Sequence, residues 1–441
     1  MKVIHVLNHF LPQQTAGTEI YTWALSRQLQ QLGVEVKVVF PHYGQLADTD
    51  YVYDGISVRQ YAEPTVEDRA LIMGFREPDG LKNYTQFLLN EQPDIVHFHE
   101  LAAGSGINLA HIKAAKKSGA KVIMTFHLAG YSCKTGTLVY KGRELCNGVI
   151  NLGKCSICYL HSKGYSLTAP LLVYSSALMY QLNIDTSKCK SRIGTAFATV
   201  PLLAQLKKNL HDLVDSCDRV VSITHWYKRV LLENGVQEEK ISFIPTALPF
   251  SIQPSLHQQA DEPRPLRILF LGRINPFKGL HLLLEAIRFM DEKSIDLDIY
   301  GQSSDPDYEE QCRLLVKDKS NIHWKGLLEQ KDVVTTMRRY HALCLCSTFS
   351  EMAPLVIQEA YAAGIPVIAS HVHGNAEQIN HGDNGLLFRY NDVDSLRQQF
   401  EKCIADTGLL KRLAQKIQSP VDFSAVAGSY HQLYKKLISA V

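Results

Sequence analysis

The sequence predicts an α/β fold in two domains, each built around a parallel β-sheet. Three observations lead to this prediction. The chain has 441 residues, which is more than one ordinary domain holds. Short apolar segments alternate with amphipathic segments in the first half, and the same pattern restarts in the second half. Between the halves, residues 251–265 read SIQPSLHQQADEPRP, a polar and proline-rich segment that is typical of a linker.

The first domain is expected over residues 1–250, where predicted strands and helices alternate. Repeated strand–helix units place parallel strands side by side, with helices on both faces of the sheet. The predicted strands are 3–7, 34–40, 95–99, 121–126, 219–223 and 241–244, and the predicted helices are 19–32, 81–90 and 107–118.

The second domain is expected over residues 266–420 and repeats the pattern. Its predicted strands are 268–271, 296–300, 322–324, 341–346 and 367–369, and its first helix is 281–290. A short helix is predicted at 353–360, with Pro354 in the first turn, where its missing N–H costs nothing. The end of the chain, 421–441, carries one more helical pattern over 423–438.

Charge is unevenly distributed, although the net charge is only +2. Residues 101–200 contain 12 Lys and Arg against 2 Asp and Glu, a formal +10, whereas residues 1–100 contain 7 against 13, a formal −6. A basic stretch of this kind suits an anionic membrane surface or a phosphate-bearing acceptor, and it is equally typical of a solvated face. Residues 165–213 are rich in Tyr and Leu, which leaves two alternatives open: a segment that lies on a membrane, or an internal helical insertion.

The chain opens on a strand-like segment rather than a signal peptide, and no apolar run reaches the length of a membrane span. We therefore expect a cytoplasmic protein, with the inner face of the plasma membrane as a site of peripheral contact. In that compartment the ten cysteines would be thiols or metal ligands rather than disulfides. No feature of the sequence indicates a nucleic-acid partner.

The segment Ser350 to Ser370, SEMAPLVIQEAYAAGIPVIAS, is the most informative in the chain. Glu351 and Glu359 are eight residues apart, at the start of the predicted helix and one or two turns along it. Backbone N–H groups around Met352 and Leu355 would face an anion at the helix start. A carboxylate further along can accept hydrogen bonds from sugar hydroxyls, and a nucleotide-sugar site requires that pairing.

Two cations follow the first strand of the second domain. Arg273 and Lys278 lie between the buried strand 268–271 and the next helix, at the edge of the sheet where ligands bind in open α/β folds. Gly301 follows the next strand and is expected to border the same pocket.

The pattern G-R-x4-K-G followed by E-x7-E resembles the retaining GT-B glycosyltransferases of family 4. The resemblance extends over nearly the whole chain and implies two Rossmann-like domains facing a central cleft. It also implies that 421–441 crosses back to the N-terminal domain. Arg273 and Lys278 would neutralise the diphosphate, Glu359 would bind the ribose, and Glu351 would lie near the transferred sugar.

Two residues of the first domain gain a role from the same resemblance. Gly17 precedes the first helix, where the backbone could approach a phosphate or sugar; the alternative is an ordinary turn with Thr18 as helix N-cap. His127 ends the strand 121–126 and resembles the family's histidine that faces the donor sugar. His97 and His99 share one face of a strand, and we interpret them as structural or cleft-lining rather than as a metal pair.

A separate pattern is the cysteine set in a predicted insertion at about 131–160. Cys133, Cys146, Cys155 and Cys158 follow the spacing C-x12-C-x8-C-x2-C, with glycines interspersed. Four thiolates around one ion form a closed tetrahedral site, so we predict structural rather than catalytic zinc. Iron–sulfur ligation and free or redox-active thiols are the alternatives.

These observations predict a retaining glycosyltransferase of cell-surface polysaccharide synthesis. It would move a sugar from a UDP- or GDP-sugar to a glycan or lipid-linked acceptor, and it would need no catalytic metal because protein cations stabilise the leaving diphosphate. Two alternatives stay open at this point. One is a nucleotide-sugar epimerase or phosphorylase of the same fold, and the other is a non-catalytic, zinc-stabilised scaffold.

Overall fold

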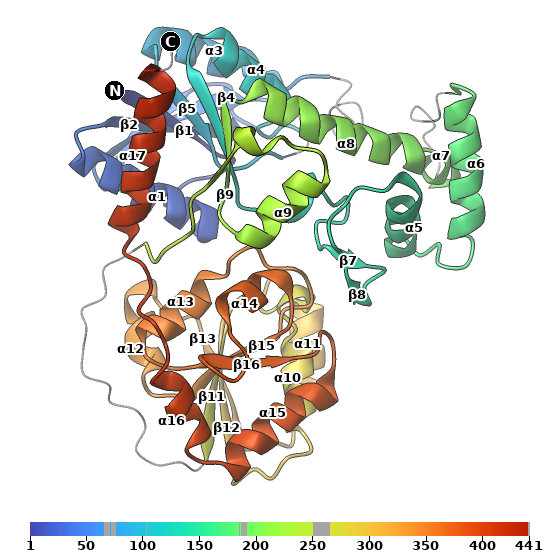
Figure 1. The fold of residues 1–441 in the computed structure, drawn as a ribbon, viewed down its shortest axis with the longest axis vertical. Helices are drawn as coiled ribbons and strands as arrows, with labels where there is room; N and C mark the ends of the chain where they lie inside the picture. The colour runs from blue at the N-terminus through green and yellow to red at the C-terminus, as the bar shows by residue number, and fades with distance from the viewer. Residues whose placement is uncertain are drawn as a thin grey trace. The chain divides into compact units, whose positions relative to one another are not determined.

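The computed structural model describes residues 1–65, 71, 76–102, 104–184, 186, 192–249 and 265–439. The chain divides into two compact units (Figure 1). The N-terminal unit comprises Met1–Thr137, Asn147–Phe250 and Asp422–Val441, and the C-terminal unit comprises Leu138–Cys146 and Ser251–Val421. Of the predicted linker, residues 251–264 lie outside the described residues.

The N-terminal unit is built on an eight-stranded sheet in the order β10-β9-β6-β5-β1-β2-β4-β3. Every neighbouring pair is parallel except β3 and β4, so the predicted α/β class is confirmed for this unit. The strands are β1 (Lys2–Val6), β2 (Glu35–Tyr43), β3 (Thr49–Tyr53), β4 (Ile56–Glu63), β5 (Ile95–Phe98), β6 (Lys121–Phe126), β9 (Arg219–Ser222) and β10 (Ile241–Phe243).

The sequence analysis missed the β3–β4 hairpin. Its turn is Asp54-Gly55, and both residues have positive φ, 47° and 77°. That conformation is the one Asp-Gly favours in a two-residue hairpin turn. The dipeptide between two β-rich segments was therefore the feature that could have predicted this hairpin.

Helices α1 (Gly17–Gln31) and α17 (Phe423–Ser439) pack side by side on one face of this sheet (Figure 1). Their core joins residues of β1, β5, β6 and β9, among them Val3, Ile95 and Ile123, to Tyr430 and Tyr434 of α17. The last helix of the chain thus belongs to the N-terminal unit. The other helices of this unit are α3 (Leu81–Glu91), α4 (Leu109–Lys117), α5 (Leu152–Ser162), α6 (Ala169–Gln181), α7 (Arg192–Phe197), α8 (Thr199–Ser216) and α9 (His225–Glu233), with 3₁₀ turns η1 (Ala129–Tyr131) and η2 (Glu238–Lys240).

The C-terminal unit contains a six-stranded, all-parallel sheet in the order β13-β12-β11-β14-β15-β16. The strands are β11 (Leu266–Leu271), β12 (Ile295–Tyr300), β13 (Ile322–Gly326), β14 (Ala342–Leu345), β15 (Val367–Ser370) and β16 (Gly385–Phe388). The sequence analysis missed β16, a four-residue edge strand. The short hairpin of β7 (Val139–Tyr140) and β8 (Glu144–Leu145) groups with this unit.

The helices of the C-terminal unit flank its sheet and start at the carboxyl ends of the strands. Pro354 is the N-cap of α13 in extended conformation, so that helix begins at Leu355, later than predicted. The helices are α10 (Leu280–Ile287), α11 (Pro306–Leu315), α12 (Val333–Met337), α13 (Leu355–Ala362), α14 (His373–Gln378), α15 (Val393–Ala405) and α16 (Leu409–Ala414), with 3₁₀ turns η3 (Pro276–Lys278) and η4 (Gln330–Asp332). No helix among the described residues is long and apolar enough to cross a bilayer.

Candidate active site

The C-terminal unit brings Lys278 and Glu351 into direct contact. Lys278 Nζ lies 2.5 Å from Glu351 Oε1, and Ser347 Oγ donates to the same oxygen at 2.8 Å. The lysine and glutamate side chains are only 18% and 10% exposed. A half-buried pair with two hydrogen bonds on one oxygen is a positioned group rather than a loose surface ion pair.

Gly279 explains why Lys278 can lie so close to Glu351. It has φ +66°, and a Cβ there would lie 1.9 Å from the carbonyl oxygen of Cys346. The turn before α10 therefore touches the end of β14, and only glycine permits that approach. The contact is reinforced by Thr348 N, which donates to the Phe277 carbonyl at 2.9 Å.

Arg273 and Gly301 lie at the same edge of the sheet. Gly272 N donates to the Tyr300 carbonyl, and a Cβ on Gly301 would lie 1.9 Å from the Gly272 carbonyl. The loops after β11 and β12 are thus held together at Gly301. Arg273, on the first of these loops, is exposed and makes no ion pair with any described residue.

The start of α13 follows Glu351 directly. Pro354 provides no side-chain cap, and Leu355 lies in the first turn, where an α-helix supplies no partner for its N–H groups. Gly374 of α14 presses against this loop, because a Cβ there would lie 2.2 Å from the Glu351 carbonyl and 2.5 Å from that of Met352. The loop that leads into α13 is therefore fixed from both sides, with first-turn amides available to an anion.

Glu359 lies within α13 and is 8% exposed. Gln330 Nε2 donates to Glu359 Oε1 at 2.7 Å. Burial raises the pKa of Glu359, and the hydrogen bond from Gln330 opposes that shift. A partly desolvated carboxylate with one oxygen already oriented is suited to accept hydrogen bonds from vicinal hydroxyls.

The predicted residues of the N-terminal unit occupy two places in that unit. Gly17 begins α1, whose N-cap is Ala16, so the alternative with Thr18 as the cap is wrong. Nothing lies within 4 Å of a Cβ built on Gly17, so packing inside this unit does not require glycine there. Glu19, two residues on, is buried; Gln14 donates to one of its oxygens at 2.6 Å, and burial raises its pKa.

His127 follows β6 and is half-buried. Its Nε2 lies 3.2 Å from His99 Nδ1, and the ring of Tyr21 packs edge-on at 4.7 Å. Burial lowers the pKa of His127 to about 3, so the ring is neutral at physiological pH. His97 and His99 are fully buried.

The four predicted zinc ligands do not form a compact group. Cys155 and Cys158 lie one turn apart on α5 in the N-terminal unit with Cys133, whereas Cys146 groups with the C-terminal unit. Among the described residues, two groups of three ligating side chains have their ligand atoms within 4.8 Å of one another, and neither contains a cysteine. None of the nine described cysteines forms a disulfide.

Both units match families of known proteins. Residues 253–419 match the family described as "Glycosyl transferases group 1", and residues 15–150 match "Glycosyltransferase Family 4". The chain has the two Rossmann-like domains of the GT-B fold. The predicted resemblance is therefore confirmed at the level of the fold.

Relatives of this chain include two bacterial proteins. One is an uncharacterised 41.2 kDa protein in the cps region of Klebsiella pneumoniae, 23% identical over 51% of this chain and 63% of its own length. Another is the amylovoran biosynthesis glycosyltransferase AmsK of Erwinia amylovora, 26% identical over 44% of this chain and 49% of its own. The chain thus covers less than two thirds of either relative.

Among solved structures, this chain is similar to Anabaena Alr3699/HepE in complex with UDP and glucose. The TM-score is 0.62 at 14% identity, over 99% of each chain. At that identity the likeness establishes the fold alone.

Several residues of the candidate site were not predicted from the sequence. Ser347 and Gln330 act through single side-chain hydrogen bonds to Glu351 and Glu359, and no local pattern marks such partners. Asn275 caps the turn by accepting from Lys278 N at 3.2 Å. Gly374 was detectable in principle, since a glycine just inside a helix is unfavourable unless close packing requires it.

Proposed function

We propose that this protein is a retaining glycosyltransferase that moves a sugar from a nucleoside diphosphate sugar to a glycan or lipid-linked acceptor in cell-surface polysaccharide synthesis. The C-terminal unit would hold the donor, UDP- or GDP-linked, and the N-terminal unit would hold most of the acceptor. The family matches and the polysaccharide-related relatives support this proposal.

One observation carries the proposal: the carboxyl edge of the C-terminal sheet gathers Lys278, Glu351 and the start of α13. A cation and oriented amides stabilise the negative charge that develops on a departing diphosphate. Arg273, unpaired among the described residues, supplies a second cation on the same edge. These groups act without a divalent metal.

Glu359 and His127 complete the assignment. Glu359 would accept hydrogen bonds from the ribose hydroxyls, and Glu351 would hold both Lys278 and the sugar. His127, as a neutral imidazole, would contact a sugar oxygen. Retention would follow if the acceptor attacks on the face that the diphosphate leaves.

The test is acceptor-dependent release of nucleoside diphosphate, with the anomeric configuration of the product read by NMR. A retaining transferase releases diphosphate only with acceptor and keeps the donor's configuration. Interconversion of the donor sugar would instead identify an epimerase, and phosphate-dependent release of sugar 1-phosphate from a glycan would identify a phosphorylase. Full transfer by the Glu359→Ala and Lys278→Ala variants would refute the donor site.

An exposed apolar face on α6 supports the proposal of a membrane-borne acceptor. One face of α6 packs on a small core through Val173 and Ala169, while its opposite face is apolar and exposed. Leu171 is 69% and Tyr174 is 71% exposed, and Leu178 continues the stripe at helical spacing. Figure 1 shows α5, α6 and α7 gathered at the N-terminal end of α8. The insertion is thus helical but only partly internal.

The charge pattern indicates an anionic lipid surface as the occupant of this stripe. Residues 164–184 contain no charged side chain, and the surrounding stretch 101–200 has a formal charge of +10. An apolar face beside basic residues is typical of interfacial helices. We therefore propose that α6 lies on the membrane with Leu171 and Tyr174 in the headgroup boundary.

Sedimentation with phosphatidylglycerol-containing vesicles tests this surface. Wild-type protein should bind these vesicles, and the Leu171→Asp/Leu178→Asp variant should lose most binding. Leu89→Asp is the matched control, because Leu89 is 53% exposed on α3 of the same unit. Equal binding by all three proteins would refute the surface, as would a dimer that the α6 variant dissociates in the absence of lipid.

We further propose structural zinc at Cys133, Cys146, Cys155 and Cys158. The proposal rests on thiolate donor chemistry and on the one-turn spacing of Cys155 and Cys158 on α5, since the four cysteines do not form a compact group in the structure. Elemental analysis should find one zinc per chain, which the Cys155→Ser variant loses and the Cys403→Ser variant keeps. Iron in place of zinc, or no metal, would contradict the proposal.

A further inference from the structure

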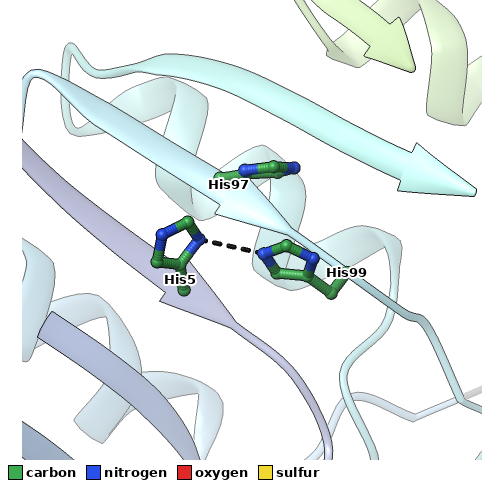
Figure 2. A group of neighbouring side chains, drawn as sticks. All are labelled: His5, His97 and His99. Atoms are coloured by element: carbon green, nitrogen blue, oxygen red, sulfur yellow. Dashed lines mark hydrogen bonds between the residues drawn. The ribbon is translucent and has the colours of Figure 1, made fainter. Parts of the chain in front are cut away.

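A layer of histidines lies on the face of the N-terminal sheet that α17 covers. His5 of β1 pairs in register with His97 of β5, and His99 follows two residues later on the same face. Figure 2 shows the three rings together, with His5 and His99 pointing toward each other. All three are fully buried. His127, the residue assigned above to the sugar, joins the layer through His99.

Three of these rings form a chain of two hydrogen bonds. His5 Nδ1 lies 2.9 Å from His99 Nε2, and His99 Nδ1 lies 3.2 Å from His127 Nε2. Burial lowers the pKa of His5 and His127 to about 3 and that of His99 well below its ordinary value. Each ring is therefore neutral and carries one N–H. Since His99 has a single proton, it donates to one neighbour and accepts from the other.

Only two proton arrangements satisfy both bonds. In the first, each ring is protonated on Nδ1: His5 donates to His99, and His99 donates to His127. In the second, each is protonated on Nε2 and the direction reverses. His5 Nε2 decides between them, because it is buried and has no hydrogen-bond partner among the described residues. The second arrangement would bury an N–H without an acceptor, which folded proteins rarely tolerate.

We propose that His99, held in turn by His5, is a positioning residue that keeps His127 in its Nδ1–H tautomer. The Nε2 of His127 is then an acceptor committed to His99, and its Nδ1–H is the atom left for a ligand. This inference rests on the proposed function for its catalytic meaning. It specifies that His127 acts as a hydrogen-bond donor to a substrate oxygen, and not as a general base.

A metal centre is the other chemistry that these rings suggest, since ligand atoms of His5, His97 and His99 lie within 4.8 Å of one another. His97 argues against it. Its Nδ1 lies 2.6 Å from the hydroxyl of Tyr434, and its Nε2 lies 2.7 Å from that of Thr125. An ion would have to displace one of these bonds as well as one of the two bonds of His99, to His5 or to His127.

Nitrogen NMR of the wild-type protein, labelled with ¹⁵N-histidine, tests the proposal without reference to activity. The expected result at pH 7 is a His127 ring with protonated Nδ1 and unprotonated Nε2. A protonated Nε2, or a cationic His127, would overturn the assignment. The measurement needs no substitution in the layer, so misfolding of a variant cannot obscure it.

The His99→Phe variant tests the positioning role. We expect the Nε2–H form of His127 to appear and kcat to fall about tenfold, the effect of weakening one hydrogen bond. The affinity for the nucleoside diphosphate alone should not change. His111→Phe is the control: His111 is a buried histidine of the same unit that bonds Tyr61 and caps α4, so its loss affects stability without touching the layer.

Two outcomes separate this inference from the proposed function. If His99→Phe leaves both the His127 tautomer and kcat unchanged, the positioning role is wrong even though transfer stands. If His127→Ala retains full transfer activity, the sugar-facing role of His127 is wrong, whichever tautomer NMR detects.

Discussion

The polar side chains that characterise the two units differ in charge: those of one unit are neutral and those of the other are ionic. In the N-terminal unit the polar feature is a layer of imidazoles that burial keeps neutral and that hydrogen-bond to one another. In the C-terminal unit the polar feature is a charged pair, Lys278 and Glu351, at the carboxyl ends of the strands. The same α/β architecture thus produces a neutral polar site in one unit and an ionic one in the other.

The difference follows from where each group lies along its strand. His5 and His97 lie within strands, where solvent cannot reach a charged ring, so desolvation disfavours the charged form. Lys278 and Glu351 lie beyond the carboxyl ends of strands, where each has the other as an oppositely charged partner. The ionic unit is therefore the one suited to a diphosphate, and the neutral unit is suited to hydroxyl groups.

Acid should affect the two units unequally, and this is the largest effect we expect. The lowered pKa of His5, about 3 against an ordinary 6.5, means that the unfolded chain binds more protons in this range. Stability is therefore fully present above pH 6.5 and falls as the pH drops toward 3, by on the order of 5 kcal/mol for His5 alone. Hydrogen exchange resolved by peptide should show β1, β5 and β6 losing protection first. Simultaneous loss in β11 and β14 would contradict this account.

Lys278→Ala should lower kcat/KM for transfer by about 100-fold to 1000-fold, the usual effect of removing one group that stabilises developing charge. The fold should survive, because Lys278 is partly exposed. Lys331→Ala is the matched control, since Lys331 pairs with Glu329 on the surface of the same unit. Steady-state kinetics of both variants against wild type measure the effect, and equal rates would remove Lys278 from the site.

Two glycines should respond in opposite ways to alanine. Gly279→Ala places a Cβ on the Cys346 carbonyl at positive φ, so we expect a loss of about 2 kcal/mol or more in the free energy of unfolding. Gly17→Ala meets open space, so its stability should change by less than about 0.5 kcal/mol while transfer activity falls. Urea denaturation with parallel activity assays distinguishes them. A Gly17 variant with full activity would leave that residue a simple turn.

The smallest effect concerns Glu351. Its carboxylate accepts a hydrogen bond from Lys278, and it would compete with a phosphate for the same ammonium group. Glu351→Gln keeps the shape but removes the charge, so nucleoside diphosphate should bind a few-fold tighter while transfer slows. Calorimetric titration with UDP and GDP tests the first half. Weaker binding would show that Glu351 helps to hold the diphosphate instead.

The sequence predicted the alternation of strands and helices well because buried parallel strands are continuous apolar segments. It missed β3, β4 and β16, which lie at or near sheet edges; β3 is mostly polar and exposed, and β16 has only four residues. At the site, the positions of Lys278, Glu351 and Glu359 follow from local motifs. Their partners do not, since Ser347, Gln330 and His5 acquire their roles only from contacts made across the fold.

The Cys-rich insertion also shows what the sequence does not predict. The cysteine spacing predicts four ligands, but spacing along a chain does not fix which segments pack together. Cys146 directly follows β8 in a segment that groups with the C-terminal unit, while Cys155 and Cys158 lie on α5. The exposed face of α6 could not be predicted either, because a helix rich in Leu and Tyr has the same composition whether it is buried or exposed.

The most direct test of the central claim, that the C-terminal unit grips a diphosphate through Lys278 and its neighbouring amides, is calorimetric. UDP and UMP, and GDP and GMP, are titrated into wild-type protein and into Lys278→Ala. We predict that the wild type binds at least one diphosphate more tightly than its monophosphate and that Lys278→Ala abolishes most of this preference. An equal preference in both proteins, or none in the wild type, would contradict it.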